Sequence, residues 1–239
     1  MKRVDVLAIA AHPDDIELLC GGTLIRSHML GRQTAILDLA AGEMASRGTP
    51  DLRAKEAAKA AKVMGVAVRE NLGLPDGGIQ NTPETRAKVA LVIRRLQPRV
   101  VITHSQHGRH PDHPIVAQLV RDACFVAGLK KIEPKVAPHR PLKVLHALSF
   151  REDNQKPTFV VDITEAFQKK LEAIGCYESQ FGDVVQAGEV YPNGEPLHDL
   201  IRHHAAHYGS LIRCRYGEPF YTTETMRVDD VASLEVATF

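Results

Sequence analysis

The feature that most constrains this fold is a repeated alternation of apolar runs and helical patterns in the first half of the chain. The first run, Val4 to Ala11, is interrupted only by Asp5, as expected of a central strand covered on both faces. Further strands are predicted at Ala35 to Ala40, Val68 to Leu74 and Val100 to Thr103. Because helical patterns separate these strands, we predict an α/β fold with a mostly parallel sheet and helices on both faces.

The predicted helices begin at recognisable residues. Thr49 is the expected N-cap, with Pro50 at the first helical position, of a helix that runs to Met64. Other helices are predicted over residues 15–30, which include Gly21 and Gly22, from Thr82-Pro83-Glu84 to before Pro98, and over Ile115 to Val126. The second half predicts strands at Val144 to Phe150 and Phe159 to Ile163, and helices at Thr164 to Cys176 and Pro196 to Tyr208. No segment has the composition of a linker, so we expect residues 1–239 to form a single domain.

Composition narrows the classes of partner. The formal net charge is +1 without a basic stripe, which argues against nucleic acid or an anionic membrane as the main partner. The apolar N-terminal segment is too short to span a membrane, and no signal-peptide cleavage pattern follows it. Four widely spaced cysteines, Cys20, Cys124, Cys176 and Cys214, are typical of a reduced cytoplasmic protein.

Two clusters of histidine and aspartate follow predicted strands of this sheet. His12, Asp14 and Asp15 follow the first strand, and His104, His107, His110, Asp112 and His113 follow the strand that ends at Thr103. Functional groups of open parallel sheets gather in the loops at the carboxyl ends of strands, and strands near a topological switch point bring two such loops together. The sequence therefore predicts one site built from both clusters.

The residue types in these clusters predict a catalytic metal site. His12 and Asp15 lie three residues apart across a strand-to-helix junction, and His113 at the start of a helix is the third candidate ligand. Two histidines and one carboxylate leave a coordination position open, as in catalytic zinc sites. The same ligands also accept Fe²⁺ or another divalent ion.

Three further residues are candidates for the catalytic groups. Asp14, next to a ligand but not itself one, is the candidate base that takes a proton from water. His110 is the candidate donor to the oxyanion, with Asp112 keeping its ring charged and oriented. Alternatively, Asp14 and Asp15 simply cap a helix, and single loop histidines are usually solvated; the joint pattern favours the site.

At these two clusters the chain resembles the PIG-L/LmbE-like family of zinc-dependent N-acetylglucosaminyl deacetylases. Ala11-His12-Pro13-Asp14-Asp15-Ile16-Glu17 looks like the first family motif, and His110-Pro111-Asp112-His113 looks like the second. The resemblance implies zinc held by His12, Asp15 and His113, Asp14 as base and then acid, and His110 as oxyanion stabiliser. It also implies a Rossmann-like fold and a homo-oligomer, often a hexamer.

Finer similarities point to the bacillithiol-biosynthesis deacetylases, which act on N-acetylglucosaminyl malate. These are Tyr177-Glu178-Ser179-Gln180-Phe181, the loop from Gly42 to Thr49, and the tail with Tyr216, Glu218 and Phe220. Arg213-Cys214-Arg215 is more basic than this subgroup implies. Candidate substrate-binding residues are Arg53, Arg109, Glu43, Ser46, Arg47 and Tyr191.

The expected function is therefore zinc-dependent removal of the N-acetyl group from a small N-acetylglucosaminide. The alternatives are a family deacetylase or amidase with another substrate, namely a mycothiol precursor, a chitooligosaccharide or an amide conjugate, and a non-catalytic metal-binding protein. A nucleotide-binding or glycosyltransferase protein on a similar sheet needs a glycine-rich loop after the first strand, where His12-Pro13-Asp14-Asp15 stands instead. His203 and His207 have helical zinc-binding spacing but lack the metalloprotease glutamate, which favours a helix surface or a subunit contact.

Overall fold

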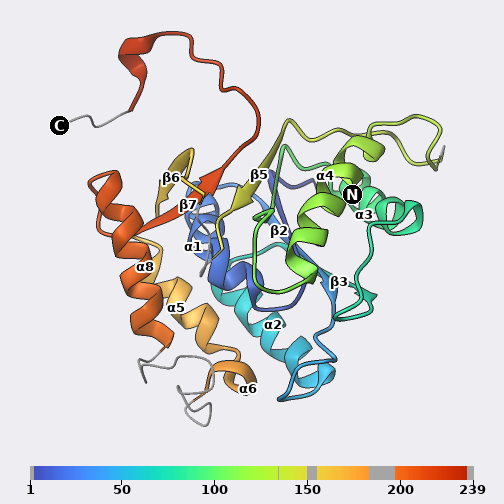
Figure 1. The fold of residues 1–239 in the computed structure, drawn as a ribbon, viewed down its shortest axis with the longest axis horizontal. Coiled ribbons are helices and arrows are strands. Elements are labelled where there is room, and N and C mark those ends of the chain that lie inside the picture. Colours follow the sequence, from blue (N-terminus) through green and yellow to red (C-terminus); the bar gives the residue numbers. More distant parts are fainter. Residues whose placement is uncertain (1–2, 134, 150–154, 183–196, 236–239) are drawn as a thin grey trace.

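The computed structural model describes residues 3–133, 135–149, 155–182 and 197–235, and these residues form a three-layer α/β structure (Figure 1). One seven-stranded sheet has the order β3-β2-β1-β4-β5-β7-β6. Its strands are β1 (Val6–Ala10), β2 (Thr34–Ala40), β3 (Val68–Leu74), β4 (Val100–His104), β5 (Lys143–Ala147), β6 (Phe159–Asp162) and β7 (Gly217–Tyr221). The helices are α1 (Asp15–Met29), α2 (Pro50–Met64), α3 (Pro83–Leu96), α4 (Asp112–Ala127), α5 (Phe167–Gly175), α6 (Glu178–Phe181) and α8 (Leu197–Leu211).

The predicted parallel sheet is confirmed for the first five strands. β1 pairs in parallel with β2 on one side and β4 on the other, and β2–β3 and β4–β5 are also parallel. The order 3-2-1-4-5 is that of a Rossmann-like sheet, with its topological switch point between β1 and β4.

β7 is the strand that the sequence analysis missed. It lies between β5 and β6 and runs antiparallel to both, so that β6 is the edge strand at that end of the sheet. Its sequence, Gly-Glu-Pro-Phe-Tyr, contains a proline, which cannot donate a ladder hydrogen bond and so argues against a buried strand. All five of its residues are nevertheless buried.

Helices cover both faces of the sheet, as the alternation predicted. On one face, Ala8 and Ala10 of β1 pack in a core with apolar residues of α1, α2, α5 and α8. On the other face, Leu7 and Ile9 pack with α3 and α4. Since β1 is covered on both sides, its near-continuous apolar sequence is explained.

Local signals place most helix starts correctly. The Thr49 side chain accepts from the amide of Leu52, and Thr82 forms a capping box with Thr85. α4 begins at Asp112 rather than Ile115, so His113 lies in its first turn. α5 begins only at Phe167, and the predicted helix start at Pro196 and strand end at Phe150 lie outside the described residues. Among the described residues, no helix is long and apolar enough to cross a membrane.

Gly22 lies where α1 packs closely against the sheet. A Cβ atom at this position would lie 2.8 Å from Cδ1 of Ile163 and 2.9 Å from Oε1 of Glu218. We therefore expect Gly22→Ala to destabilise the protein by about 1–3 kcal/mol through overpacking. Urea unfolding would measure the loss, with Gly175→Ala at the end of α5 as a control for an added methyl group that meets nothing within 4 Å. Equal stability of Gly22→Ala and the wild type would contradict this packing.

Candidate active site

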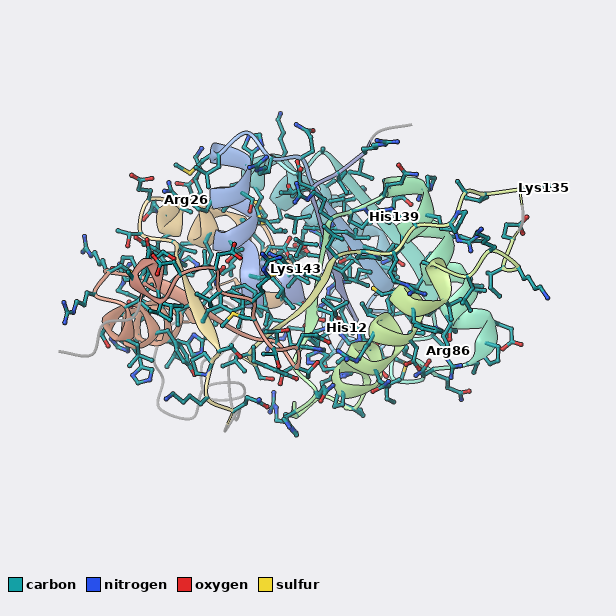
Figure 2. All side chains as sticks on the ribbon, turned by 90° about the horizontal axis from the view of Figure 1, so that it is seen from above. His12, Arg26, Arg86, Lys135, His139 and Lys143 are labelled. Carbon is teal, nitrogen blue, oxygen red and sulfur yellow. The ribbon has the colours of Figure 1, made fainter. Side chains whose placement is uncertain are left out.

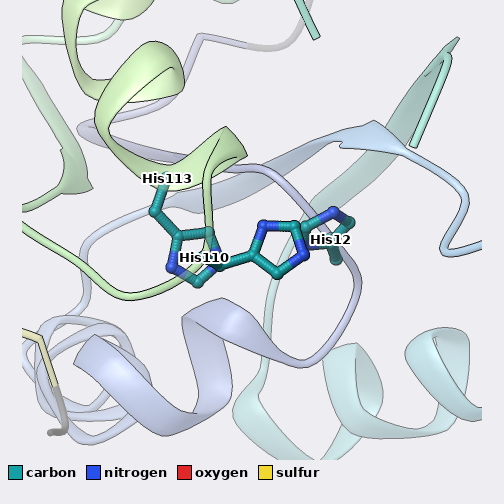
Figure 3. Close-up of side chains that lie close together, drawn as sticks. All are labelled: His12, His110 and His113. Atoms are coloured by element: carbon teal, nitrogen blue, oxygen red, sulfur yellow. The ribbon is translucent and has the colours of Figure 1, made fainter. Parts of the chain in front are cut away.

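The switch point of the sheet brings the two His/Asp clusters together. The loop after β1 carries His12, and the loop and first turn after β4 carry His110 and His113, whose rings lie next to one another in Figure 3. The ring centroids of His12 and His110 are 4.7 Å apart, and those of His110 and His113 are 5.0 Å apart. His12 is 6% exposed and lies toward the middle of Figure 2, whereas Lys135 lies at its margin. The predicted meeting of the two loops is thus observed.

The His12 ring is held between carboxylates. Its Nε2 lies 2.9 Å from Oδ1 of Asp76 and 3.3 Å from Oδ2 of Asp112, and its Nδ1 lies 3.3 Å from Oδ2 of Asp15. Burial lowers the pKa of His12, but Asp15, Asp76 and Asp14 together raise that pKa to about 9. A carboxylate on the outer nitrogen is the usual support of a metal-ligating histidine, and it leaves Nδ1 to face a metal.

Asp15 is the buried carboxylate between the two loops. Its Oδ2 accepts a 2.8 Å hydrogen bond from the amide of His12, and its Oδ1 lies 3.3 Å from Nε2 of His113. Although burial opposes ionisation, His113 holds the pKa of Asp15 well below its ordinary value. The group is therefore an ionised oxygen donor.

These donors fit a zinc ion, and among the described residues three overlapping groups have donor atoms within 4.8 Å of one another. The groups are His12, His110 and His113; His12, Asp76, His110 and Asp112; and Asp15, His104 and His113. Nε2 of His104 already accepts a 2.9 Å hydrogen bond from the amide of Ala11, so its lone pair is used. The lone pairs that remain include those of the predicted ligands His12, Asp15 and His113, a nitrogen and oxygen set that suits zinc and other divalent ions.

Asp14 adopts a backbone conformation that is rare for a residue with a side chain. Its φ is 105°, and its buried side chain makes no helix-capping hydrogen bond. Instead, Oδ2 accepts a 2.6 Å hydrogen bond from Nη2 of Arg53, whose Nε donates to the carbonyl of Pro13 at 3.0 Å. Burial raises the pKa of Asp14 to about 7, although Arg53 lowers it. The capping interpretation therefore fails for Asp14, and strain of this kind concentrates at functional sites.

His110 is oriented differently from the prediction. The backbone amide of Asp112, not its carboxylate, donates to Nδ1 of His110 at 3.2 Å. The Asp112 carboxylate instead accepts from the amide of Gly77 at 2.8 Å, beside His12. Burial and the neighbouring His12 and His113 lower the pKa of His110. This arrangement favours a neutral ring with its proton on Nε2, rather than the charged ring that we expected.

A cavity of about 350 Å³ opens beside these groups, within the usual size range of small-molecule sites. It is lined by His12, Asp14, Asp15, Leu18, Leu19, Met44, Ala45, Arg53, Asp76, Arg109, His110, His113, Ser149 and Phe181. Of the predicted substrate-binding residues, Arg53 and Arg109 line it. Glu43, Ser46 and Arg47 do not, although their loop contributes Met44 and Ala45, and Tyr191 lies outside the described residues.

Asp76 is the site residue that the sequence analysis missed. Besides its contact with His12, its Oδ2 accepts from the amide of Met44 at 3.0 Å, and its own amide donates to Glu43 at 2.8 Å. It thus joins the loop after β3 to the loop after β2. The sequence carries a signal for it, because Asp76 also follows the carboxyl end of a predicted strand, but the residue types of Pro75-Asp76-Gly77-Gly78 indicate only a turn.

Comparison with known proteins matches this chain to a deacetylase family and to two deacetylases. The sequence profile of the PIG-L family, described as GlcNAc-PI de-N-acetylase, matches residues 7–124. A diacetylchitobiose deacetylase of Thermococcus kodakarensis is 29% identical over 231 residues, which cover 89% of this chain and 80% of the relative. A probable N-acetyl-alpha-D-glucosaminyl L-malate deacetylase 2 of Bacillus cereus is 29% identical over 195 residues, covering 73% and 83%.

Two other similar proteins are not described as deacetylases. A 4-oxalmesaconate hydratase of Pseudomonas putida is 26% identical over 189 residues, 73% of each chain. The crystal structure of a conserved protein from Thermus thermophilus has a TM-score of 0.84 and 37% identity, and the match covers 95% of this chain and 98% of that one. The histidine and aspartate clusters lie on the matched part of the fold, and the chain belongs to the PIG-L family.

Proposed function

We propose that this protein is a zinc-dependent deacetylase that removes the N-acetyl group of a small N-acetylglucosaminide and releases acetate. The observation that carries the proposal is the pairing of a buried, strained carboxylate, Asp14, with the His12, Asp15 and His113 donor set on one cavity. Deacetylases of N-acetylated amino-sugars among its relatives support the reaction type.

The residues around the cavity include a group to accept and return the proton of water and a group to donate a hydrogen bond to the oxyanion, as amide hydrolysis requires. A zinc ion held by His12, Asp15 and His113 would lower the pKa of a bound water to ~7 and polarise the amide carbonyl. Asp14 accepts the proton of the attacking water and then passes it to the amine nitrogen as the carbon–nitrogen bond breaks. Nε2–H of His110 donates to the oxygen that becomes negative. The products are acetate and the free amine.

N-acetylglucosaminyl malate is the substrate that we propose. The Bacillus cereus relative and the cationic Arg109 on the cavity wall support a malate group with its two carboxylates. Arg53 already pairs with Asp14, so we assign it to the base rather than to the substrate. We also propose a single cytoplasmic domain that forms homo-oligomers; free Cys20, Cys124, Cys176 and Cys214 support a reducing compartment.

A substrate panel tests the proposed function. We expect acetate release from N-acetylglucosaminyl malate to exceed release from diacetylchitobiose and the acetylated glucosaminyl-inositol, and a chelator to abolish it. Faster turnover of another acetylated sugar would overturn the malate assignment but keep the deacetylase. Hydration of 4-oxalmesaconate without acetate release would identify a hydratase, and bound metal without turnover of any compound would leave a metal-binding protein.

The pH dependence of kcat/KM should report the Asp14–Arg53 pair. Asp14 must be ionised to act as base, and burial raises its pKa from 3.8 to about 7, which a bound cation would offset. We therefore expect activity to rise with pH, with an apparent pKa between these two values. Because the charge of Arg53 lowers the pKa of Asp14, Arg53→Gln should move this rise to higher pH. An unmoved profile with a raised KM alone would instead make Arg53 a substrate ligand.

A further inference from the structure

α1 is not one regular helix. At Cys20 the backbone leaves the helical region, with φ −142° and ψ 21°, so a segment Asp15–Leu19 precedes the break and a segment Gly21–Met29 follows it. A break of this kind leaves carbonyls at the end of the first segment and amides at the start of the second without helical partners. Buried groups of this kind must find partners elsewhere in the protein.

A buried ion pair fills the break. Glu218 accepts from the amide of Gly22 at 2.9 Å and from the amide and hydroxyl of Thr23 at 2.6 Å each. Nζ of Lys170 donates to the carbonyl of Leu18 at 2.8 Å and to Oε1 of Glu218 at 2.6 Å. The anion thus meets the start of one helical segment and the cation meets the end of the other, which is the favourable sign at each helix end.

This pair connects distant parts of the chain to the active site. Lys170 lies on α5 and Glu218 on β7, and both are almost fully buried. The amide of Leu18 donates to the carbonyl of Asp14 at 3.1 Å, so two hydrogen bonds lead from Lys170 to the base. Leu18 also lines the cavity. A buried ion pair adds little net stability, because the cost of removing both charges from water offsets their attraction. Its main effect here is therefore on the position of the segment Asp15–Leu19.

We propose that Lys170 and Glu218 are positioning residues for the active site. The pair fixes the break in α1 and so holds the segment Asp15–Leu19, with Asp14 directly before it, against the cavity. Gly22 belongs to the same arrangement, because a Cβ atom there would lie 2.9 Å from the Glu218 carboxylate. The proposal rests on the proposed function only for its activity measurement, since zinc affinity and amide exchange report the same segment independently of any substrate.

The experiment compares Lys170→Met, Glu218→Gln and the double variant with a matched control, Arg94→Met. Arg94 is also a buried cation that donates to a carbonyl at a helix end, that of Ala127 in α4 at 2.8 Å, but it lies outside the cavity. Each variant is measured well below its melting temperature for kcat, KM, zinc dissociation constant and hydrogen exchange of the α1 amides. Thr23→Val removes one hydrogen bond to Glu218 and provides a milder change that keeps the fold.

We expect both single variants to lower kcat or zinc affinity by about 10–100-fold, the usual effect of removing a residue that supports a metal site. KM should change much less, because the cavity walls remain, and amides of α1 should exchange faster. Thr23→Val should lie between these variants and the wild type. The double variant carries no unpaired buried charge, so its melting temperature should recover while kcat stays low.

The proposal is overturned if Lys170→Met and Glu218→Gln lose only thermal stability and keep wild-type zinc affinity and α1 exchange. Recovery of kcat together with the melting temperature in the double variant would also overturn it. So would a loss of zinc affinity in Arg94→Met as large as that in Lys170→Met. If the wild type releases no acetate, the proposed function fails, but zinc affinity and exchange still decide the positioning role.

Discussion

Asp14→Asn is expected to lower kcat by about 10²–10⁴-fold, the range that a general acid–base group contributes, while zinc still binds. Asparagine keeps the shape of the side chain but cannot accept the proton of the attacking water or return it to the amine. The predicted ligands His12, Asp15 and His113 are unchanged, so metal content should stay at the wild-type level. Acetate release and metal analysis on the same preparation measure the two effects together.

Asp14→Asn also removes the charge partner of Arg53, so its control must separate catalysis from loss of an ion pair. Glu70→Gln also weakens a carboxylate–arginine pair, because Oε1 of Glu70 accepts a 2.7 Å hydrogen bond from Nη1 of Arg95. Glu70 lies on β3 and does not line the cavity. That variant should keep its kcat. Near-normal turnover by zinc-loaded Asp14→Asn would mean that another group is the base.

His113→Ala is expected to remove both the metal and the activity. The variant deletes one of the three proposed ligands, and the lost transition-state stabilisation of at least ~4 kcal/mol corresponds to about 10³-fold in kcat. A chelator should bring the wild type to the same low rate, and added Zn²⁺ or Fe²⁺ should restore the wild type but not the variant. Metal stoichiometry and acetate release provide the measurements.

The control for this loss is His207→Ala. His207 is exposed on α8, and the groups of donor atoms found among the described residues do not include it. It should therefore keep full metal content and turnover. If His207→Ala lost the metal and His113→Ala kept it, the metal site would have to be moved to α8.

The parts of this fold that follow from local sequence could be predicted. Caps at Thr49 and Thr82 and the apolar period of β1 are properties of a few neighbouring residues, and the structure confirms them. The break at Cys20 could not be predicted in this way, because Lys170 and Glu218, which stabilise it, are far away along the chain. The strand at Pro219 is likewise fixed by pairing with β5 and β6 rather than by its own composition.

In the candidate site, too, some features could be predicted from the sequence and others depend on contacts of the folded chain. His12, Asp15 and His113 could be found because the carboxyl ends of neighbouring parallel strands must meet at one edge of the sheet. The orientation of His110 could not, since a backbone amide holds its ring and no residue type reveals that contact. The geometry of hydrogen bonds to the main chain depends on the folded loop, and a pattern of residue types does not encode it directly.

The backbone at Asp14 has a consequence for evolution and engineering of this enzyme. Glycine is the residue that adopts a φ of 105° without steric cost, but Asp14→Gly alone would leave the buried guanidinium of Arg53 without its carboxylate partner. The double variant Asp14→Gly/Arg53→Met removes both charges, so we expect it to be more stable than the wild type by about 1 kcal/mol or more. A selection for thermostability alone would therefore favour replacing the proposed base together with its partner. Natural selection for turnover and selection for a higher melting temperature pull in opposite directions at this position.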